Sequence, residues 1–227
     1  MSNSDLNFVI ICSALSIGIL LLIVVLGMAL SRRKTQGFSP LRNFPYEMDF
    51  SKNKISNIIF RSLFFLVPLS YFPLIPICTI FVNGNQSGTG TFYLIHAICF
   101  ILSLISLGVL FILDLGKFVK PHLIILVISM SLSLLAFAGF GTFTLNFNLQ
   151  DAKSIVFCVI SVIYIFVFPI LVFGSKKNVF KLDKNVDMQG NVTLIRPKFF
   201  LLAFLEWYLV FGQILYIVLN LIEFITL

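Results

Sequence analysis

Long stretches without a charged side chain are the feature that most constrains this chain. Asp, Glu, Lys and Arg are absent from 6–31, 62–113, 121–150 and 154–175, and 199–227 is interrupted only by Glu206 and Glu223. About 20 predominantly apolar residues suffice for a helix to cross the hydrocarbon core of a bilayer. Charged residues make up only 11% of the chain, against about a quarter in average soluble domains. These runs exclude a water-soluble globular protein and a disordered one.

The lengths of the runs predict an all-α integral membrane protein, a bundle of six transmembrane helices in a single domain. The run 62–113 is long enough for two helices, and the polar stretch 83–90 divides it. We expect helices at about 7–30, 58–82, 92–113, 121–145, 154–174 and 199–222. The connections 31–57, 114–120 and 175–198 then lie on one side of the membrane.

The basic residues predict the orientation of these helices. Fifteen of the sixteen Lys and Arg residues lie in or beside the connections 31–57, 114–120 and 175–198, and only Lys153 lies on the opposite side. Cytoplasmic loops carry an excess of Lys and Arg, so these connections are expected in the cytoplasm and both termini outside. The net charge of +7 is therefore a topology signal that also favours anionic lipid headgroups. It does not indicate nucleic-acid binding.

A polar stripe on the last predicted helix is the strongest candidate for function. Glu206, Gln213 and Asn220 recur every seven residues, close to two helical turns, so they share one face, and Tyr216 lies near the same stripe. Glu206 is expected about 10 Å above the cytoplasmic end of the helix. An ionisable side chain at such a depth is costly unless it faces the bundle interior or water.

Three interpretations of the stripe stay open from the sequence. It can join helices structurally, with Glu206 paired to Arg61 or to serines of another helix, because Arg61 lies where the second helix begins and can extend toward the interface. It can contact a helix of a partner protein. It can also line a path for a substrate or an ion.

Two further helices carry distinctive residues. Pro68, Pro73 and Pro76 predict a bent or partly unwound outer half of the second helix, because each proline removes a backbone hydrogen bond. Small residues allow membrane helices to approach closely, and one face of the fourth helix is expected to pack in this way. That face consists of Ser129, Ser133, Ala136 and Gly139.

Two cytoplasmic connections are long enough to hold structure. Apolar and other residues alternate over 44–50, which favours an extended segment with one face on the membrane or a partner. Two short apolar runs, 178–182 and 191–195, surround residues with turn chemistry and predict a small hairpin. His122 follows Pro121 at the start of the fourth helix, and we expect it at the membrane interface.

Motifs of enzymes are missing from the sequence. There is no metal-binding His pair, Gly-x-Ser-x-Gly elbow or Walker-type loop, so we expect no catalytic residue, metal or cofactor. The first hypothesis is a non-catalytic subunit or scaffold of a membrane complex, with membrane lipids and other integral membrane proteins as partners. The alternative is a small transporter or channel component with a polar path along the last helix. Abundant Phe, Ile, Asn and Lys suggest an AT-rich genome and a bacterial plasma membrane.

Overall fold

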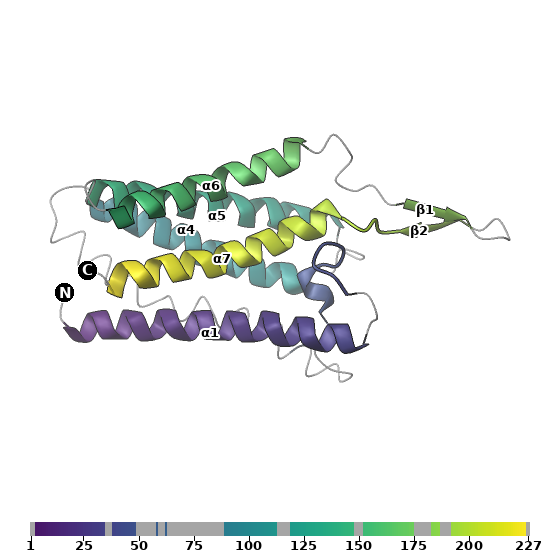
Figure 1. Cartoon of the computed structure of the whole chain (residues 1–227), viewed down its shortest axis with the longest axis horizontal. Coiled ribbons are helices and arrows are strands. Elements are labelled where there is room, and N and C mark those ends of the chain that lie inside the picture. Colours follow the sequence, from purple (N-terminus) through teal and green to yellow (C-terminus); the bar gives the residue numbers. More distant parts are fainter. Residues whose placement is uncertain are drawn as a thin grey trace.

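The computed structural model describes residues 3–34, 38–48, 58, 62, 89–112, 119–147, 152–174, 183–186 and 192–225. Its long helices are α1 (Asn3–Lys34), α4 (Thr89–Ile112), α5 (Val119–Phe147), α6 (Ala152–Gly174) and α7 (Leu201–Ile225), shown in Figure 1. A short 3-10 helix, η1 (Pro45–Glu47), follows α1. Strands β1 (Asp183–Val186) and β2 (Val192–Ile195) precede α7.

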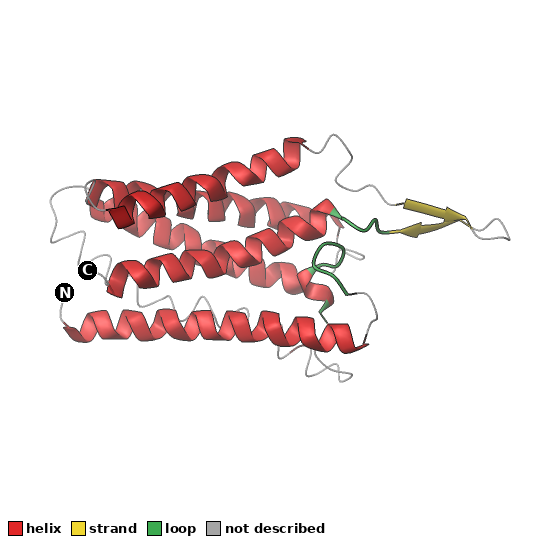
Figure 2. Ribbon diagram, viewed as in Figure 1, coloured by secondary structure: helices red, strands yellow, loops and turns green. Residues whose placement is uncertain are grey.

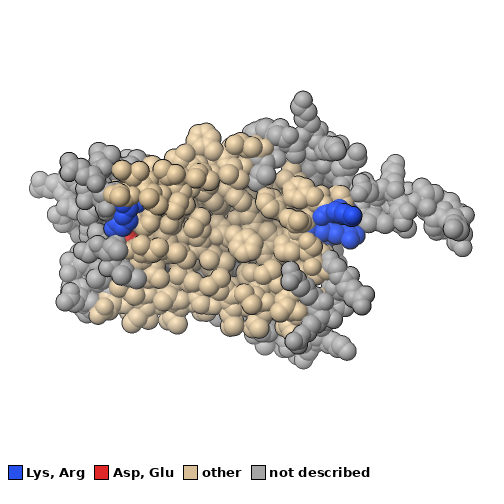
Figure 3. All heavy atoms as spheres, in the orientation of Figure 1, with Lys and Arg blue, Asp and Glu red and all other residues tan. Residues whose placement is uncertain are grey.

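Each of these five long helices is long and apolar enough to cross a membrane. The spans are Ile10–Ser31, Leu94–Phe111, Lys120–Thr142, Ala152–Ile170 and Leu201–Glu223. In the view of Figure 3, the charged side chains of the described residues lie at the two ends of the molecule and a broad uncharged belt separates them. The chain is therefore a helical, multi-pass membrane protein. Most of the second predicted helix, 58–82, lies outside the described residues.

Side-chain contacts fix the direction of every long helix in this part of the chain. Ser103 on α4 contacts Ser129 on α5, and His96 on α4 lies against Gly139 on α5, so α4 and α5 are antiparallel. The hydroxyl of Tyr164 on α6 is hydrogen bonded to Oγ of Ser133 on α5. Phe157, seven residues before Tyr164 on α6, packs on Phe140 of α5. Thus α6 is antiparallel to α5.

Helix α7 runs parallel to α5, because Glu206 meets His122 and Tyr216, further along α7, meets Phe137. Phe38, just after α1, packs on Trp207 near the start of α7. Figure 1 shows α1 beginning at the end of the bundle where α7 finishes. Helices α1 and α4 therefore run in the same direction.

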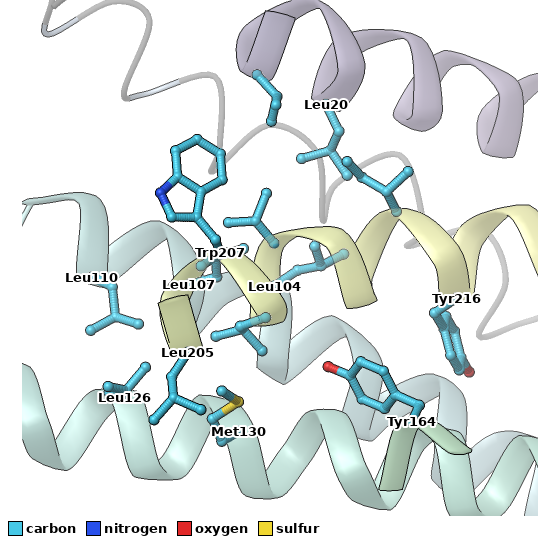
Figure 4. Close-up of a cluster of buried hydrophobic side chains, with 14 of the residues drawn as sticks. Leu20, Leu104, Leu107, Leu110, Leu126, Met130, Tyr164, Leu205, Trp207 and Tyr216 are labelled. Atoms are coloured by element: carbon cyan, nitrogen blue, oxygen red, sulfur yellow. The ribbon is translucent and has the colours of Figure 1, made fainter. Parts of the chain in front are cut away.

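Helix α7 is the central element of the bundle. Buried residues make up 67% of its most apolar stretch, compared with 22% for α6. Its buried side chains meet leucines of α1, α4 and α5 in the cluster of Figure 4, where Trp207 and Tyr216 project from α7 toward different neighbours. Lipid is as apolar as these side chains, so close packing and interhelical hydrogen bonds hold such helices together.

The predicted small-residue face of α5 lies inside the bundle. Ser129, Ser133 and Ala136 are buried. A Cβ atom placed on Gly139 would lie only 2.5 Å from Cβ of His96, so a larger residue at 139 cannot fit without a shift. The missing side chain is what lets α4 and α5 approach at this level.

The connection after α1 and the one before α7 differ in how far they follow the sequence pattern. Strands β1 and β2 pair in an antiparallel hairpin, with Asp183 opposite Ile195, and Figure 2 shows it projecting beyond the helices. The first strand begins later than the apolar run 178–182 suggested. The predicted extended segment is interrupted at 45–47, while 49–50 lie outside the described residues. Pro45 begins the η1 turn, and the carboxylate of Glu47 accepts a hydrogen bond from the backbone N–H of Phe44.

Candidate functional site

A buried carboxyl–imidazole pair lies near the end of the bundle where α5 and α7 begin. Nε2 of His122 is 2.7 Å from Oε1 of Glu206, and the two side chains are 0% and 2% exposed. The parallel direction of α5 and α7 brings these residues to the same depth. Either group can hold the proton that the pair shares, so the pair can store a proton or pass it on. His122 was expected at the membrane interface; it lies three residues after α5 begins, and its side chain is buried inside the bundle.

The middle of α7 carries a second polar contact, with α4 and α5. Nε2 of Gln213 donates to Oγ of Ser103 at 2.5 Å, and Ser103 in turn donates to the backbone carbonyl of Ser129 at 3.0 Å. Oγ of Ser129 donates back to the carbonyl of Ser103 at 3.2 Å. Oε1 of Gln213 is buried and has no hydrogen-bond partner among the described residues.

One turn further along α7, Tyr216 contacts a second buried histidine. Its hydroxyl is hydrogen bonded to Nδ1 of His96, and both side chains are fully or almost fully buried. The Tyr216 ring stacks on Phe100 with centroids 4.0 Å apart and meets Phe137 and Phe140 edge-on or tilted. This aromatic surround leaves the hydroxyl and the imidazole as the polar groups of a closely packed layer.

The far end of α7 completes the row. Nδ2 of Asn220 donates to the carbonyl oxygen of Tyr216 at 2.9 Å. Glu223 is 4% exposed, and its Oε2 lies 3.2 Å from Nζ of Lys153 at the start of α6. We call Glu206, Gln213, Tyr216, Asn220 and Glu223 the α7 column. At 1.5 Å per residue the α7 column is about 26 Å long, close to the thickness of the hydrocarbon core, about 30 Å.

A side branch of hydroxyl groups leads from this region toward α6. The hydroxyl of Tyr164 is 3.0 Å from Oγ of Ser133, and the hydroxyl of Tyr208 donates to the backbone carbonyl of Tyr164. Tyr164 stacks on Phe137, with centroids 3.9 Å apart. Gly212 on α7 leaves space for the Tyr164 ring, because a Cβ atom at position 212 would overlap that ring.

Residues 38–48 cover the end of the α7 column that holds Glu206. We call them the 38–48 cap. Phe44 in this cap is fully buried, and its ring meets the His122 ring edge-on with centroids 6.3 Å apart. Nε1 of Trp207 donates to the carbonyl of Asn43 at 2.7 Å, and the backbone N–H of Phe200 donates to the carbonyl of Leu41 at 2.8 Å. The 38–48 cap is thus bound directly to the start of α7.

The residues proposed from the sequence fall into two groups. Glu206, Gln213, Tyr216 and Asn220 are all buried, and the first three bond side chains of other helices. The others lie outside the described residues: Arg61, Pro68, Pro73 and Pro76. The structure shows His122 as a partner of Glu206, and the suggested pairing with Arg61 lies outside the described residues.

Two histidines and several hydroxyl groups were not assigned to the site from the sequence. The predicted helix starts at 121 and 199 placed His122 about 1.5 Å and Glu206 about 10 Å from the starts of their helices. The actual starts, Val119 and Leu201, bring the two residues to nearly equal depth. Because each predicted helix start differed from the actual start by two residues, the sequence did not indicate that His122 and Glu206 lie side by side. His96 is buried and hydrogen bonded to the hydroxyl of Tyr216.

Comparison of the chain with protein-family models, with curated proteins and with solved structures finds no match.

Proposed function

We propose that the chain is a small membrane transport component in which protons move along the α7 column. The observation that carries this proposal is the direction of the polar stripe: it faces inward, where it meets polar groups of α4, α5 and α6. A stripe that served a partner's helix would face out of the bundle. Carboxyl, imidazole and hydroxyl groups in such a row are the groups from which intramembrane proton relays are built.

A purely structural role explains the Glu206–His122 pair less well. Hydrogen bonds between membrane helices average only about 0.6 kcal/mol in one well-measured case, and neutral serine contacts such as Ser103–Ser129 supply them here. Placing a carboxyl and an imidazole out of water costs several kcal/mol unless the pair is well made, and apolar residues of similar size often serve stability as well or better. An ionisable pair is therefore better accounted for by a task that needs a proton.

The species that moves is proposed to be a proton because the interior is closely packed. Aromatic rings of Phe100, Phe137 and Phe140 surround the Tyr216–His96 layer. A proton needs only hydrogen-bonded groups and single water molecules between them. Gln213, with one buried oxygen that lacks a partner in the described part of the chain, is a place where such a water would bind.

Proteoliposomes test this proposal. The purified full chain is reconstituted with a trapped pH-sensitive dye, and a potassium diffusion potential is applied to drive protons inward. We expect faster acidification than in protein-free vesicles, with no matching flux of sodium ions. Thr142→Val is the matched control, since Thr142 is exposed on α5 and bonds only its own helix at Ala138. Acidification no faster than in protein-free vesicles would contradict the proposal.

A second candidate function, a subunit of a larger membrane complex, is favoured by the outer face of α1. Ala14 and Gly18 lie four residues apart in a shallow apolar groove with Ile11, Leu15 and Leu22. A Cβ atom on Gly18 would meet nothing within 4 Å in the described structure. Small residues at this spacing allow close approach of another membrane helix. Mild-detergent purification and mass spectrometry test this: Gly18→Leu should remove a co-purifying membrane protein without unfolding the chain.

We further propose six spans, with both termini outside and the basic connections in the cytoplasm of a bacterial cell. The parallel direction of α1 and α4 supports an additional crossing between them, because α1 ends at the opposite side from the start of α4. The distribution of Lys and Arg supports the orientation. Labelling single cysteines with a membrane-impermeant reagent tests both. A cysteine in place of Asn85 should react from outside, and one in place of Asn178 only after the cells are opened.

A further inference from the structure

One carboxylate of the 38–48 cap, that of Glu47, joins the cap to the segment that precedes α7. Oε2 of Glu47 accepts three hydrogen bonds, from Nη1 of Arg196 at 2.6 Å, from the backbone N–H of Phe44 at 3.0 Å and from Nδ2 of Asn43 at 3.3 Å. Two of these bonds shape the cap itself. The third joins the cap to the segment between β2 and α7. Glu47 therefore stabilises the fold of the cap and also attaches the cap to the segment that precedes α7.

Arg196 holds the cap by a second contact. Its guanidinium carbon lies 4.9 Å from the centre of the Phe44 ring and 5.9 Å from that of Phe200. Phe44 and Phe200 meet edge-on, with centroids 5.6 Å apart. The guanidinium thus covers the ring that rests on His122. A planar guanidinium can bind a carboxylate and stack on an aromatic ring at once, which the ammonium of a lysine does less well.

The position of Arg196 connects the cap to the hairpin. Arg196 immediately follows β2, and in Figures 1 and 2 the hairpin extends beyond the end of the bundle. The Glu47 and Arg196 side chains are 25% and 32% exposed, while Phe44 and Met48 of the cap are buried. The ion pair is accessible from the aqueous side, and the apolar residues beneath it form the seal.

We propose that Glu47 and Arg196 form a latch that closes this end of the α7 column. With the latch closed, the 38–48 cap keeps Phe44 over His122 and shields the Glu206–His122 pair from water. When the ion pair separates, Phe44 loses its cover, the cap loosens and water reaches the pair. This role as a gate rests on the proposed proton function, whereas the latch itself is tested without any flux measurement.

The protein carries its own probe for this movement. Trp207 is the only tryptophan of the chain. It is 1% exposed, lies next to Glu206 in the sequence, and donates its Nε1 hydrogen to the cap at Asn43. Its fluorescence should be blue-shifted and poorly quenched by acrylamide while the cap is closed. Opening of the cap breaks the bond to Asn43 and exposes the indole.

Variants of the two latch residues provide the test, in the full chain in detergent. Glu47→Gln keeps an oxygen for Phe44 and Asn43 but loses the charge, and Arg196→Gln loses both the charge and most of the stacking. Because the pair is partly exposed, each change should shift the closed-to-open ratio by about three- to tenfold. Trp207 emission should move to longer wavelength and acrylamide quenching should increase. The double variant should show less than the sum of the two single effects, because both changes remove the same ion pair.

Lys198→Gln is the matched control. Lys198 is exposed and lies two residues after Arg196, so this variant removes a nearby positive charge that is not part of the latch. It should leave Trp207 unchanged. The latch is overturned if Trp207 stays protected in folded Glu47→Gln and Arg196→Gln, or if Lys198→Gln has the same effect as they do. If the latch variants do not fold, the wild-type chain is compared at low and at about 1 M salt, which screens exposed charges strongly. Trp207 should then become more accessible at high salt, and unchanged quenching would reject the latch.

A separate flux measurement distinguishes the two proposals. Exposure of Trp207 in the variants without any proton flux in the wild type supports the latch and contradicts the proposed function. Proton flux in the wild type with an unresponsive Trp207 supports the function and contradicts the latch.

Discussion

His122 on α5 and Glu206 on α7 share a hydrogen bond of 2.7 Å across 84 positions of the sequence, and almost no part of either side chain is exposed. Buried ionisable groups within a membrane are costly and mark functional sites by default. This pair lies at one end of a row of polar groups that crosses the bundle along α7, and it lies directly beneath Phe44 of the 38–48 cap. The proposed movement of protons along the α7 column therefore depends on the His122–Glu206 pair.

Two substitutions of Glu206 should distinguish the effect on stability of losing its ionisable carboxyl group from that of losing its side-chain volume. Glu206→Gln keeps a side chain that can bond a neutral His122, so thermal unfolding in detergent should change little. Glu206→Ala breaks the pair and leaves a cavity, and should cost about 3–5 kcal/mol of stability. If Glu206→Gln unfolds as readily as Glu206→Ala, the charge itself holds the fold and the structural interpretation gains.

Two glycines in different helices should respond oppositely to the same substitution. Gly139→Ala would place a methyl group 2.5 Å from Cβ of His96, and such overpacking typically costs about 1–3 kcal/mol. Gly18→Ala meets nothing within 4 Å in the described structure and should be neutral or slightly stabilising, because alanine favours a helix over glycine by up to about 1 kcal/mol. Thermal unfolding of both variants is the measurement, and equal effects would contradict the close contact of α4 and α5.

Two tyrosine hydroxyls should differ in their effect on proton flux. Tyr216→Phe removes the bond to His96 within the α7 column, and Tyr164→Phe removes the bond to Ser133 on the side branch. Each should lower stability by only about 0.5–1.5 kcal/mol, because the stacked ring remains. Flux in proteoliposomes should fall in Tyr216→Phe and be kept in Tyr164→Phe. If flux instead falls in Tyr164→Phe and is kept in Tyr216→Phe, the proton path includes the side branch toward α6 rather than the α7 column.

The sequence predicted the helical membrane character and which residues of the last helix share a face, because apolar length and a seven-residue repeat are properties of one segment. It did not predict that Glu206 meets His122 or that Tyr216 meets His96. Those contacts depend on the depth and rotation of one helix relative to another, which no single segment encodes. The 38–48 cap was missed for a related reason: alternating apolar residues suggested an extended segment, whereas Pro45 and Glu47 form a tight turn next to the buried Phe44.

The hairpin that was expected in the connection before the last helix occurs as β1 and β2. Its first strand lies at 183–186 instead of the apolar run before it. The later start leaves only five residues between the strands, and short connections are the usual ones in hairpins. Loop length therefore determined the pairing more than the apolar pattern did.

Proton flux through proteoliposomes that contain Glu206→Gln is the measurement that tests the central claim most directly. The side chain keeps its size and its hydrogen bond to His122 but can no longer release or take up a proton. The account predicts that this variant folds as the wild type does and that its proton flux falls to the level of protein-free vesicles. Undiminished flux through a folded Glu206→Gln protein would contradict a proton path along the α7 column.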